Sequence, residues 1–190
     1  MSIILASGSP RRKELMEMLG VPELKIIPAK GEEKAPEGVG PGELVMALAS
    51  AKGHEVAALC NQGDVIIAAD TIVWVNGGVY GKPHSKEQAF EMLSVLSGNT
   101  HEVYTGVSVI RDGREELSYE VSRVTFRELM SDEIQRYIET GEPMDKAGAY
   151  GAQGLGSLFV KSIDGDFFNV MGLPLCRLGQ MLKKQGVVIL

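Results

Sequence analysis

The sequence is poor in cysteine and lacks long apolar runs, and both shortages exclude classes of protein. Cys60 and Cys176 are its two cysteines, and they form neither a CxxC pair nor a zinc-ligand spacing. This usage fits buried thiols in a reducing compartment rather than a disulfide framework. No segment approaches the roughly 20 apolar residues of a membrane span. The N-terminal apolar stretch is only about four residues long and precedes its basic residues, so we expect no signal peptide and a cytoplasmic protein.

Positive charge is also in short supply. The chain has 19 Lys and Arg against 25 Asp and Glu, a formal net charge of −6. This balance argues against sequence-independent binding to nucleic acids or to acidic membranes, so any bound anion needs a local basic cluster. The 190 residues, 44% hydrophobic and 23% charged, suit one sizeable core and an ordinary globular protein. We expect a single domain over residues 1–190.

A local basic cluster follows the first apolar run. Residues 3–6 are typical of a buried strand, and Ser7-Gly8-Ser9-Pro10-Arg11-Arg12-Lys13 leads from them into a helical pattern. Ser9 suits the N-cap and Pro10 the first helical position, so N–H groups and a positive dipole end face the loop. Basic residues at this end oppose the helix dipole. The pattern favours a bound phosphate chain; an ordinary helix start with a solvated basic face is the alternative.

Strand and helix signals alternate along the rest of the chain without repeats. The apolar run 65–69 is typical of a strand covered on both faces, and it is predicted to end at Asp70. The loop predicted at 30–42 is rich in Gly, Pro and Glu. Mixed parallel and antiparallel signals predict an α/β protein with a mixed sheet. Further strands are predicted at 25–29, 72–75, 79–80, 101–110, 115–126, 157–163 and 187–190, and helices at 11–19, 43–60, 85–97, 131–141 and from Pro174 onward.

Six sequence blocks, in order and spread over nearly the whole chain, resemble the Maf family of nucleoside triphosphate pyrophosphatases. They are ASGSPRRKEL from Ala6, ADTIV from Ala69, GKP from Gly81, LSG from Leu96, HEVYTGV from His101 and TGEPMDKAGAYGAQG from Thr140. The resemblance implies an elongated α/β fold shared with inosine-triphosphate pyrophosphatases, with two lobes around a central cleft. It also implies hydrolysis of a nucleoside triphosphate to the monophosphate and pyrophosphate with a divalent metal. A house-cleaning role, a link to cell division arrest and a homodimer are further implications, although no heptad or apolar stripe locates an interface.

The chemistry that the resemblance implies requires positive charge around a triphosphate while water attacks in line with the leaving pyrophosphate. Arg12 can fork onto phosphate oxygens beside Ser7 and Ser9, and Lys52 and Lys82 can act as point charges. Lys82 lies in a tight Gly-Lys-Pro turn. A position on the solvent face of a helix is the alternative for Lys52, and the resemblance assigns it to the site.

Asp70 is the predicted catalytic carboxylate. It follows an apolar strand, where open α/β sheets present ligand groups, and it can hold Mg²⁺ or Mn²⁺ and orient or deprotonate water. A structural cap between the strand and the following hairpin is the alternative. The resemblance implies Glu33 as a second metal ligand. Glu32-Glu33 stands where the family often has Asp-Glu, which leaves open which of the two acids faces the metal.

Thr71 and Gln153 are the residues predicted to recognise the base. At Thr71 and in the segment around Gln153, the sequence resembles the family branch that acts on dTTP and UTP rather than on 7-methyl-GTP. A Gln amide both donates and accepts, which matches the adjacent carbonyl and N–H of uracil or thymine. Gly151 and Gly154 permit close approach of the backbone to a ring. The same glycines also suit an irregular surface loop.

Other classes of function fit the sequence less well. A non-catalytic nucleotide sensor that regulates septum formation would use the same pocket, but a pure binder gains little from a carboxylate beside phosphates. The sequence contains no P-loop, kinase glycine-rich loop or Nudix-type acidic helix. His54-Glu55 and His101-Glu102 both lack the second His of a zinc protease motif.

Overall fold

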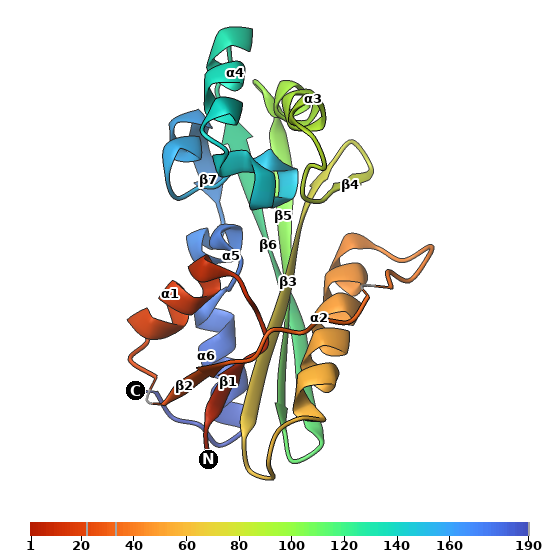
Figure 1. Cartoon of the computed structure of the whole chain (residues 1–190), viewed down its shortest axis with the longest axis vertical. Helices are drawn as coiled ribbons and strands as arrows, with labels where there is room; N and C mark the ends of the chain where they lie inside the picture. Colours follow the sequence, from red (N-terminus) through yellow and green to blue (C-terminus); the bar gives the residue numbers. More distant parts are fainter. Residues whose placement is uncertain (22, 33, 190) are drawn as a thin grey trace. The chain divides into compact units, whose positions relative to one another are not determined.

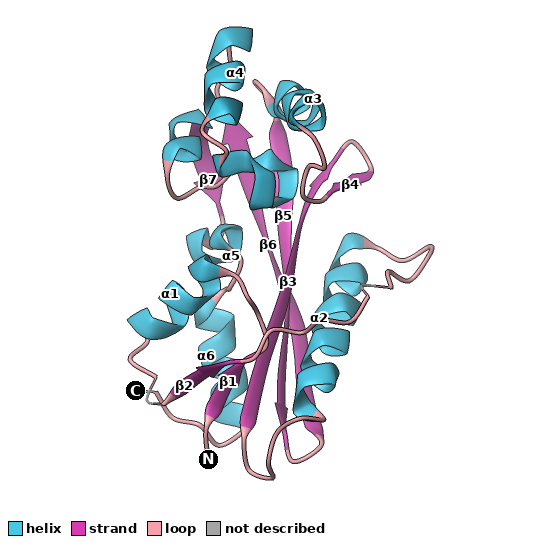
Figure 2. Ribbon diagram, in the orientation of Figure 1, coloured by secondary structure: helices cyan, strands magenta, loops and turns pink. Residues whose placement is uncertain are grey.

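The structure, a computed structural model, describes residues 1–21, 23–32 and 34–189. Figures 1 and 2 show how its strands and helices alternate along the chain. The strands are β1 (Ile3–Leu5), β2 (Leu24–Ile26), β3 (Val65–Val75), β4 (Gly78–Tyr80), β5 (Thr100–Arg111), β6 (Arg114–Phe126) and β7 (Val160–Asp164). The helices are α1 (Pro10–Met18), α2 (Pro41–Ala57), α3 (Lys86–Leu96), α4 (Ser131–Glu139), α5 (Phe167–Met171) and α6 (Leu175–Lys184), with 3₁₀ turns η1 (Glu142–Asp145), η2 (Ala147–Ala149) and η3 (Leu155–Phe159).

The strands form one mixed sheet, which confirms the predicted α/β class. Their order is β2-β1-β3-β5-β6-β7, and β4 pairs with β3. β1 is parallel to β2 and to β3, whereas β3 pairs with β4 and β6 with β7 in antiparallel fashion. Among the described residues, no helix combines the length and apolar character needed to cross a bilayer.

The chain packs into two compact units. The first comprises residues 1–70, 105–120 and 172–190, and the second comprises residues 71–104 and 121–171. β3, β5 and β6 each contribute residues to both units. The single domain expected over residues 1–190, and the central cleft that the resemblance implies, stay predictions.

In the first unit, α2 packs closely against the sheet because glycines lie at the contact. A methyl group at Gly53 would lie 2.9 Å from Ser108 Oγ, and one at Gly106 would overlap the main chain of Val45. Strand and helix side chains form an apolar cluster on this side, composed of Ile4, Ala6, Val56, Ile66, Ala68 and Ile110. The close approach fixes the distance between α2 and β5.

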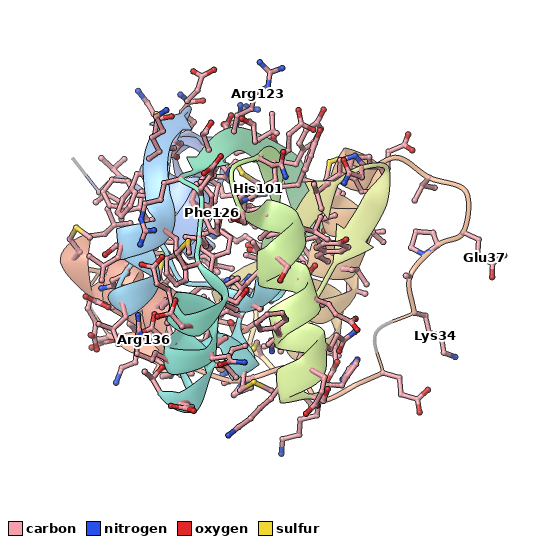
Figure 3. The ribbon with its side chains drawn as sticks, turned by 90° about the horizontal axis from the view of Figure 1, so that it is seen from above. Lys34, Glu37, His101, Arg123, Phe126 and Arg136 are labelled. Carbon is pink, nitrogen blue, oxygen red and sulfur yellow. The ribbon has the colours of Figure 1, made fainter. Side chains whose placement is uncertain are left out.

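The core of the second unit is aromatic at its centre. The Phe126 ring makes edge-to-face contacts with His101 and Tyr150, and its centroid lies 5.1 Å and 4.7 Å from theirs, respectively. Figure 3 labels Phe126 and His101. His101 is 2% exposed, and its Nε2 lies 2.8 Å from the Tyr150 hydroxyl. Burial lowers the pKa of His101 to about 4. The imidazole is therefore neutral at pH 7.

Local turn signals predicted both hairpins correctly. Asn76 and Gly77 have φ values of 51° and 77°, and Asp112 and Gly113 have values of 49° and 77°. Two consecutive residues of positive φ form the turn that matches the twist of antiparallel strands. The dipeptides Asn-Gly and Asp-Gly therefore fix where β3 meets β4 and where β5 meets β6.

The predicted end of a strand at Asp70 was wrong, because β3 runs unbroken from Val65 to Val75. Its pairing with β1 ends at Ile67, and its pairing with β4 begins at Val73. A change of partners along one strand leaves no local mark in the sequence. Asp70 therefore lies inside β3, beyond the end of the neighbouring strand β1.

The predicted last strand was also wrong over residues 187–189, which are neither helix nor strand; residue 190 lies outside the described residues. Gly186 has a φ of 76°, and the N–H of Val187 donates to Leu182 O at 2.9 Å. The amide that a strand would use caps the end of α6 instead. The sequence pattern likewise missed α5.

Candidate active site

The opening turn forms at the carboxyl end of β1, as predicted. α1 begins at Pro10, with Ser9 at its N-cap position in an extended conformation. Ser7 is buried, and its Oγ accepts the N–H of Ser9 at 3.3 Å. Within the described residues, the Ser9 hydroxyl makes no capping hydrogen bond. The positive end of the α1 dipole therefore faces this turn, as binding of an anion requires.

Arg12 folds back onto the same turn. Its Nη1 donates to Ser7 Oγ at 3.1 Å, and its Nε donates to the main-chain oxygen of Gly172 at 2.7 Å. These bonds fix the direction of the guanidinium, a rigid fork of five N–H donors. Gly172 lies 160 residues further along the chain, so no local pattern could indicate it. The structure thus joins two of the predicted substrate ligands, Ser7 and Arg12.

Lys52 and Asp70 form a close ion pair. Nζ of Lys52, on α2, lies 2.6 Å from Oδ1 of Asp70, on β3. The two side chains are only 19% and 11% exposed. Removing one partner of such a pair would leave the other charge uncompensated in a place with little water, so the pair is costly to break. The sequence indicated each residue separately, and the structure makes them one charged unit.

The register of β1 and β3 brings the opening turn and Asp70 to one edge of the first unit. Leu5 pairs with Ile67 in parallel, and the N–H of Ala6 donates to Ile67 O at 2.7 Å. Ser7 and Asp70 both follow these paired residues. The edge predicted for Asp70 therefore exists, but the end of β1 creates it rather than the end of β3.

Glu55 anchors the start of the loop that the sequence predicts at residues 30–42. Its Oε1 accepts the N–H of Lys30 at 2.7 Å, and its two oxygens accept the N–H of Gly31 at 3.2 and 3.0 Å. Sequence reasoning missed Glu55, because its partners lie 24 and 25 residues away. Glu33, the predicted second metal ligand, lies outside the described residues. In the part of the chain that the structure describes, no three His, Cys, Asp or Glu side chains are grouped to hold a metal.

In the second unit, a main-chain hydrogen bond joins the Gly-Lys-Pro turn to the glycine-rich segment of residues 148–156. The N–H of Gly148 donates to Gly81 O at 3.0 Å, and Pro83 is buried. The intervening Lys82 is exposed. The backbone on either side of Lys82 is therefore held while its side chain extends into solvent, a suitable mount for a charge that reaches a phosphate.

Gln153 and Thr71 also belong to the second unit. Gln153 is exposed in an irregular loop between Gly151 and Gly154, and Thr71 is half-buried on β3. Gly148 lies five residues before Gln153, and its N–H donates to the main-chain oxygen of Gly81, the residue before Lys82. Gln153 and Lys82 thus lie on connected segments of this unit.

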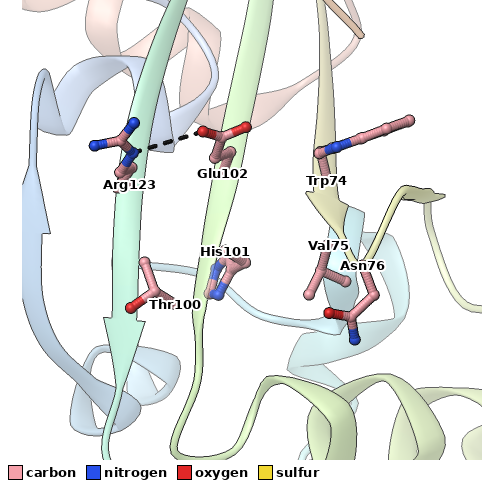
Figure 4. Close-up of a pocket in the computed structure, with 7 residues that line it drawn as sticks. All are labelled: Trp74, Val75, Asn76, Thr100, His101, Glu102 and Arg123. Carbon is pink, nitrogen blue, oxygen red and sulfur yellow. Dashed lines mark ion pairs between the residues drawn. The ribbon is translucent and has the colours of Figure 1, made fainter.

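A pocket of about 300 Å³ lies elsewhere, on β3, β5 and β6 of the second unit (Figure 4). Trp74, Glu102 and Arg123 line it, and Arg123 Nε lies 3.6 Å from Glu102 Oε1. None of the residues that line this pocket was predicted for the active site. We therefore do not assign the pocket to nucleotide hydrolysis.

Comparison with known proteins shows the family of the chain. The profile of a family described as Maf-like protein matches residues 2–185. The chain belongs to the Maf family. Two relatives of this Maf protein, from Bacillus anthracis and from Bacillus cereus (strain ZK / E33L), are named dTTP/UTP pyrophosphatase. Each is 50% identical to it over 185 residues, which cover 97% of the Maf chain and 96% of the relative.

A solved structure shares the fold of this Maf protein. The structure of a HAM1 protein from Coxiella burnetii superposes with a TM-score of 0.53 and 17% sequence identity. The match covers 97% of the Maf chain and 99% of the other chain. At this identity the likeness establishes the fold alone.

Proposed function

We propose that this protein is a nucleoside triphosphate pyrophosphatase that hydrolyses dTTP and UTP to the monophosphate and pyrophosphate. The relatives that carry this name are half identical to it over nearly the whole of both chains. The observation that carries the proposal is the buried pair of Lys52 and Asp70, beside the turn that holds Ser7 and Arg12. We also propose a cytoplasmic location for the enzyme, as the sequence predicts, because its expected substrates are found there.

The opening turn binds the triphosphate in this proposal. Ser7, Ser9 and the N-terminus of α1 supply hydrogen bonds and a positive dipole end, and Arg12 adds a guanidinium already directed by its bonds to Ser7 and Gly172. Lys82 contributes a further positive charge from its anchored turn. These groups neutralise the oxygens of the leaving pyrophosphate, where negative charge increases during the reaction.

Asp70 orients the attacking water and accepts its proton. A carboxylate suits this role when it is held in one direction, and Lys52 holds Asp70 through its contact at 2.6 Å. Because the pair is almost shielded from water, its charges act at close range in a medium of low dielectric constant. Lys52 therefore serves Asp70 as well as the substrate.

We further propose that a divalent cation binds at Asp70. Magnesium is held in proteins by one or two carboxylates together with substrate phosphates and water, and a carboxylate of two oxygens with Lys52 on Oδ1 fits that pattern. The cation would polarise the phosphate under attack and lower the pKa of water. Glu33, or its neighbour Glu32, is the proposed second ligand. A homodimer stays a prediction.

Gln153 and Thr71 select the base in this proposal. The amide of Gln153 can donate to a carbonyl and accept from the adjacent N–H, as uracil and thymine require. A purine offers a different edge and a larger ring. The exposure of Gln153 on a loop suits contact with a ligand better than a role in the core.

The decisive test follows the products of hydrolysis with UTP, dTTP, CTP, ATP and GTP, in the presence of Mg²⁺ or Mn²⁺. We expect pyrophosphate from UTP and dTTP as the main products. Orthophosphate as the sole inorganic product would refute the assigned bond. Nucleotide binding without turnover under every metal condition would instead favour the sensor.

Asp70→Asn tests the catalytic carboxylate, with Asp64→Asn as its matched control. Both acids are buried, but Asp64 accepts the main-chain N–H groups of Ser2 and Asn61. We expect Asp70→Asn to lower kcat by about 10²–10⁴ with nucleotide binding retained. Asp64→Asn should lower stability and leave kcat unchanged. An active Asp70→Asn enzyme would remove Asp70 from the mechanism.

A further inference from the structure

Glu142 binds both arms of the glycine loop 151–156. Its Oε2 accepts the N–H of Leu155 at 3.0 Å, and its Oε1 accepts the N–H of Gly156 at 3.1 Å. The hydroxyl of Tyr137 donates to Oε1 at 2.9 Å and accepts the N–H of Gly151 at 3.3 Å. One carboxylate thus fixes the end of the loop directly and its beginning through a tyrosine.

The loop is shaped to fit this carboxylate. Gly154 has a φ of 91°, and a methyl group there would lie 3.0 Å from both oxygens of Glu142. The backbone therefore approaches Glu142 as closely as a glycine allows. The Ser157 hydroxyl donates to Gly154 O at 2.6 Å and closes the turn. Gln153, the proposed base reader, precedes Gly154 directly.

Several hydrogen-bond donors stabilise the negative charge of Glu142. Burial opposes ionisation, but the N–H groups of Gly156 and Leu155 and the Tyr137 hydroxyl outweigh it and lower the pKa of Glu142. Lys146 Nζ donates to the main-chain oxygen of Glu142 at 2.6 Å. The side chain is therefore an anion at neutral pH, and it accepts hydrogen bonds at both oxygens.

We propose that Glu142 is a positioning residue for base selection: it holds the loop 151–156 in the conformation from which Gln153 reads the pyrimidine. The proposal rests on the proposed function, because it requires Gln153 to contact the base. Glu142 itself does not touch the substrate in this scheme. Its carboxylate, with Tyr137, supplies the order that an exposed, glycine-rich loop cannot supply itself.

The arrangement requires a carboxylate rather than an amide. In Glu142→Gln, an NH₂ group in place of Oε2 would face the N–H of Leu155, and in place of Oε1 it would face the N–H of Gly156. Either orientation sets two donors against each other. The variant changes shape very little, so its effect reports on these hydrogen bonds.

The test compares wild type with Glu142→Gln and Tyr137→Phe, and with Glu139→Gln as control. Glu139 is an exposed glutamate at the end of α4, so its variant makes the same change in charge without touching the loop. Steady-state kinetics are measured with UTP, dTTP and ATP. Hydrogen exchange is measured at the amides of residues 151–156.

For Glu142→Gln we expect faster exchange of the Leu155 and Gly156 amides. KM for UTP and dTTP should rise roughly tenfold, equivalent to one charge-assisted hydrogen bond, with kcat within about twofold of wild type. The ratio of kcat/KM for UTP over ATP should fall by the same factor. Tyr137→Phe should shift the same quantities in the same direction but less, and Glu139→Gln should shift none.

Unchanged exchange in a folded Glu142→Gln protein would overturn the structural half of the proposal. Faster exchange with an unchanged ratio of UTP to ATP, or equal losses for all nucleotides, would overturn the role in selection. If Glu142→Gln fails to fold, the same readings from Tyr137→Phe decide. Failure of the wild type to release pyrophosphate from UTP would refute the proposed function, and the exchange result would still stand.

Discussion

Mild acid should destabilise this protein through one buried imidazole, that of His101. The pKa of His101 is about 4 in the folded protein because of burial, and about 6.5 in an unfolded chain. As the pH falls below 6.5, His101 binds a proton in the unfolded state but not in the native state. The stability due to neutral His101 is therefore complete above pH 6.5 and is lost progressively as the pH falls toward 4.

The size of this loss follows from the two pKa values. Each unit of difference corresponds to 1.36 kcal/mol, and about 1.5 units are realised between pH 7 and pH 5, so this step costs about 2 kcal/mol. The structure gives a reason for the resistance to protonation. Among the described residues, Nδ1 of His101 has no hydrogen-bond partner, so protonation would bury a charge and an unsatisfied donor.

The assay is urea unfolding at pH 7, 6 and 5, followed by the fluorescence of Trp74, which is the single tryptophan and belongs to the same unit as His101. The control is His101→Gln, which keeps a polar group for the Tyr150 hydroxyl. Carboxylates of lowered pKa, such as Glu142, begin to titrate below this range. We expect wild type to lose about 2 kcal/mol more than the variant between pH 7 and 5; parallel pH profiles would refute the reasoning.

Four substitutions, one of them a control, test other parts of the structure. Gly106→Ala places a methyl group on the main chain of Val45 and should destabilise the protein by about 1–3 kcal/mol in thermal unfolding. In the control Gly179→Ala, in α6, the added methyl group meets no atom within 4 Å, and the protein should be stabilised by up to about 1 kcal/mol. Equal changes in stability for the two variants would contradict the close packing of α2. Arg12→Lys loses the fork and should lower kcat/KM for UTP about tenfold, and unaltered kinetics would exclude Arg12 from phosphate binding. Gln153→Glu leaves acceptors alone at the base edge, so the preference for UTP over ATP should fall, and an unchanged substrate ranking would exclude that residue from base selection.

Local signals were sufficient to predict the elements that depend on neighbouring residues. Ser9 and Pro10 predicted the start of α1, and Asn76-Gly77 predicted the hairpin that follows β3. The continuation of β3 through Asp70 could not be predicted, because it depends on strands that are distant in sequence. Local signals therefore predicted these turns and this helix start, whereas the course of a strand between distant partners left no such signal.

The same distinction applies to the candidate site. Residue type and motif indicated Lys52 and Asp70 individually, but their pairing depends on how α2 packs on the sheet. The bond from Arg12 to Gly172 crosses 160 residues. Glu142 stood within a motif that was noticed, yet its role emerged only from the positions of the amides around it.

The boundary between the two compact units falls between Asp70 and Thr71, consecutive residues of β3. The acid proposed for water activation and the side chains proposed for base choice therefore depend on separate hydrophobic interiors. Directed evolution toward new nucleobases can confine its libraries to residues 71–104 and 121–171, and leave untouched the packing that supports Lys52 and Asp70.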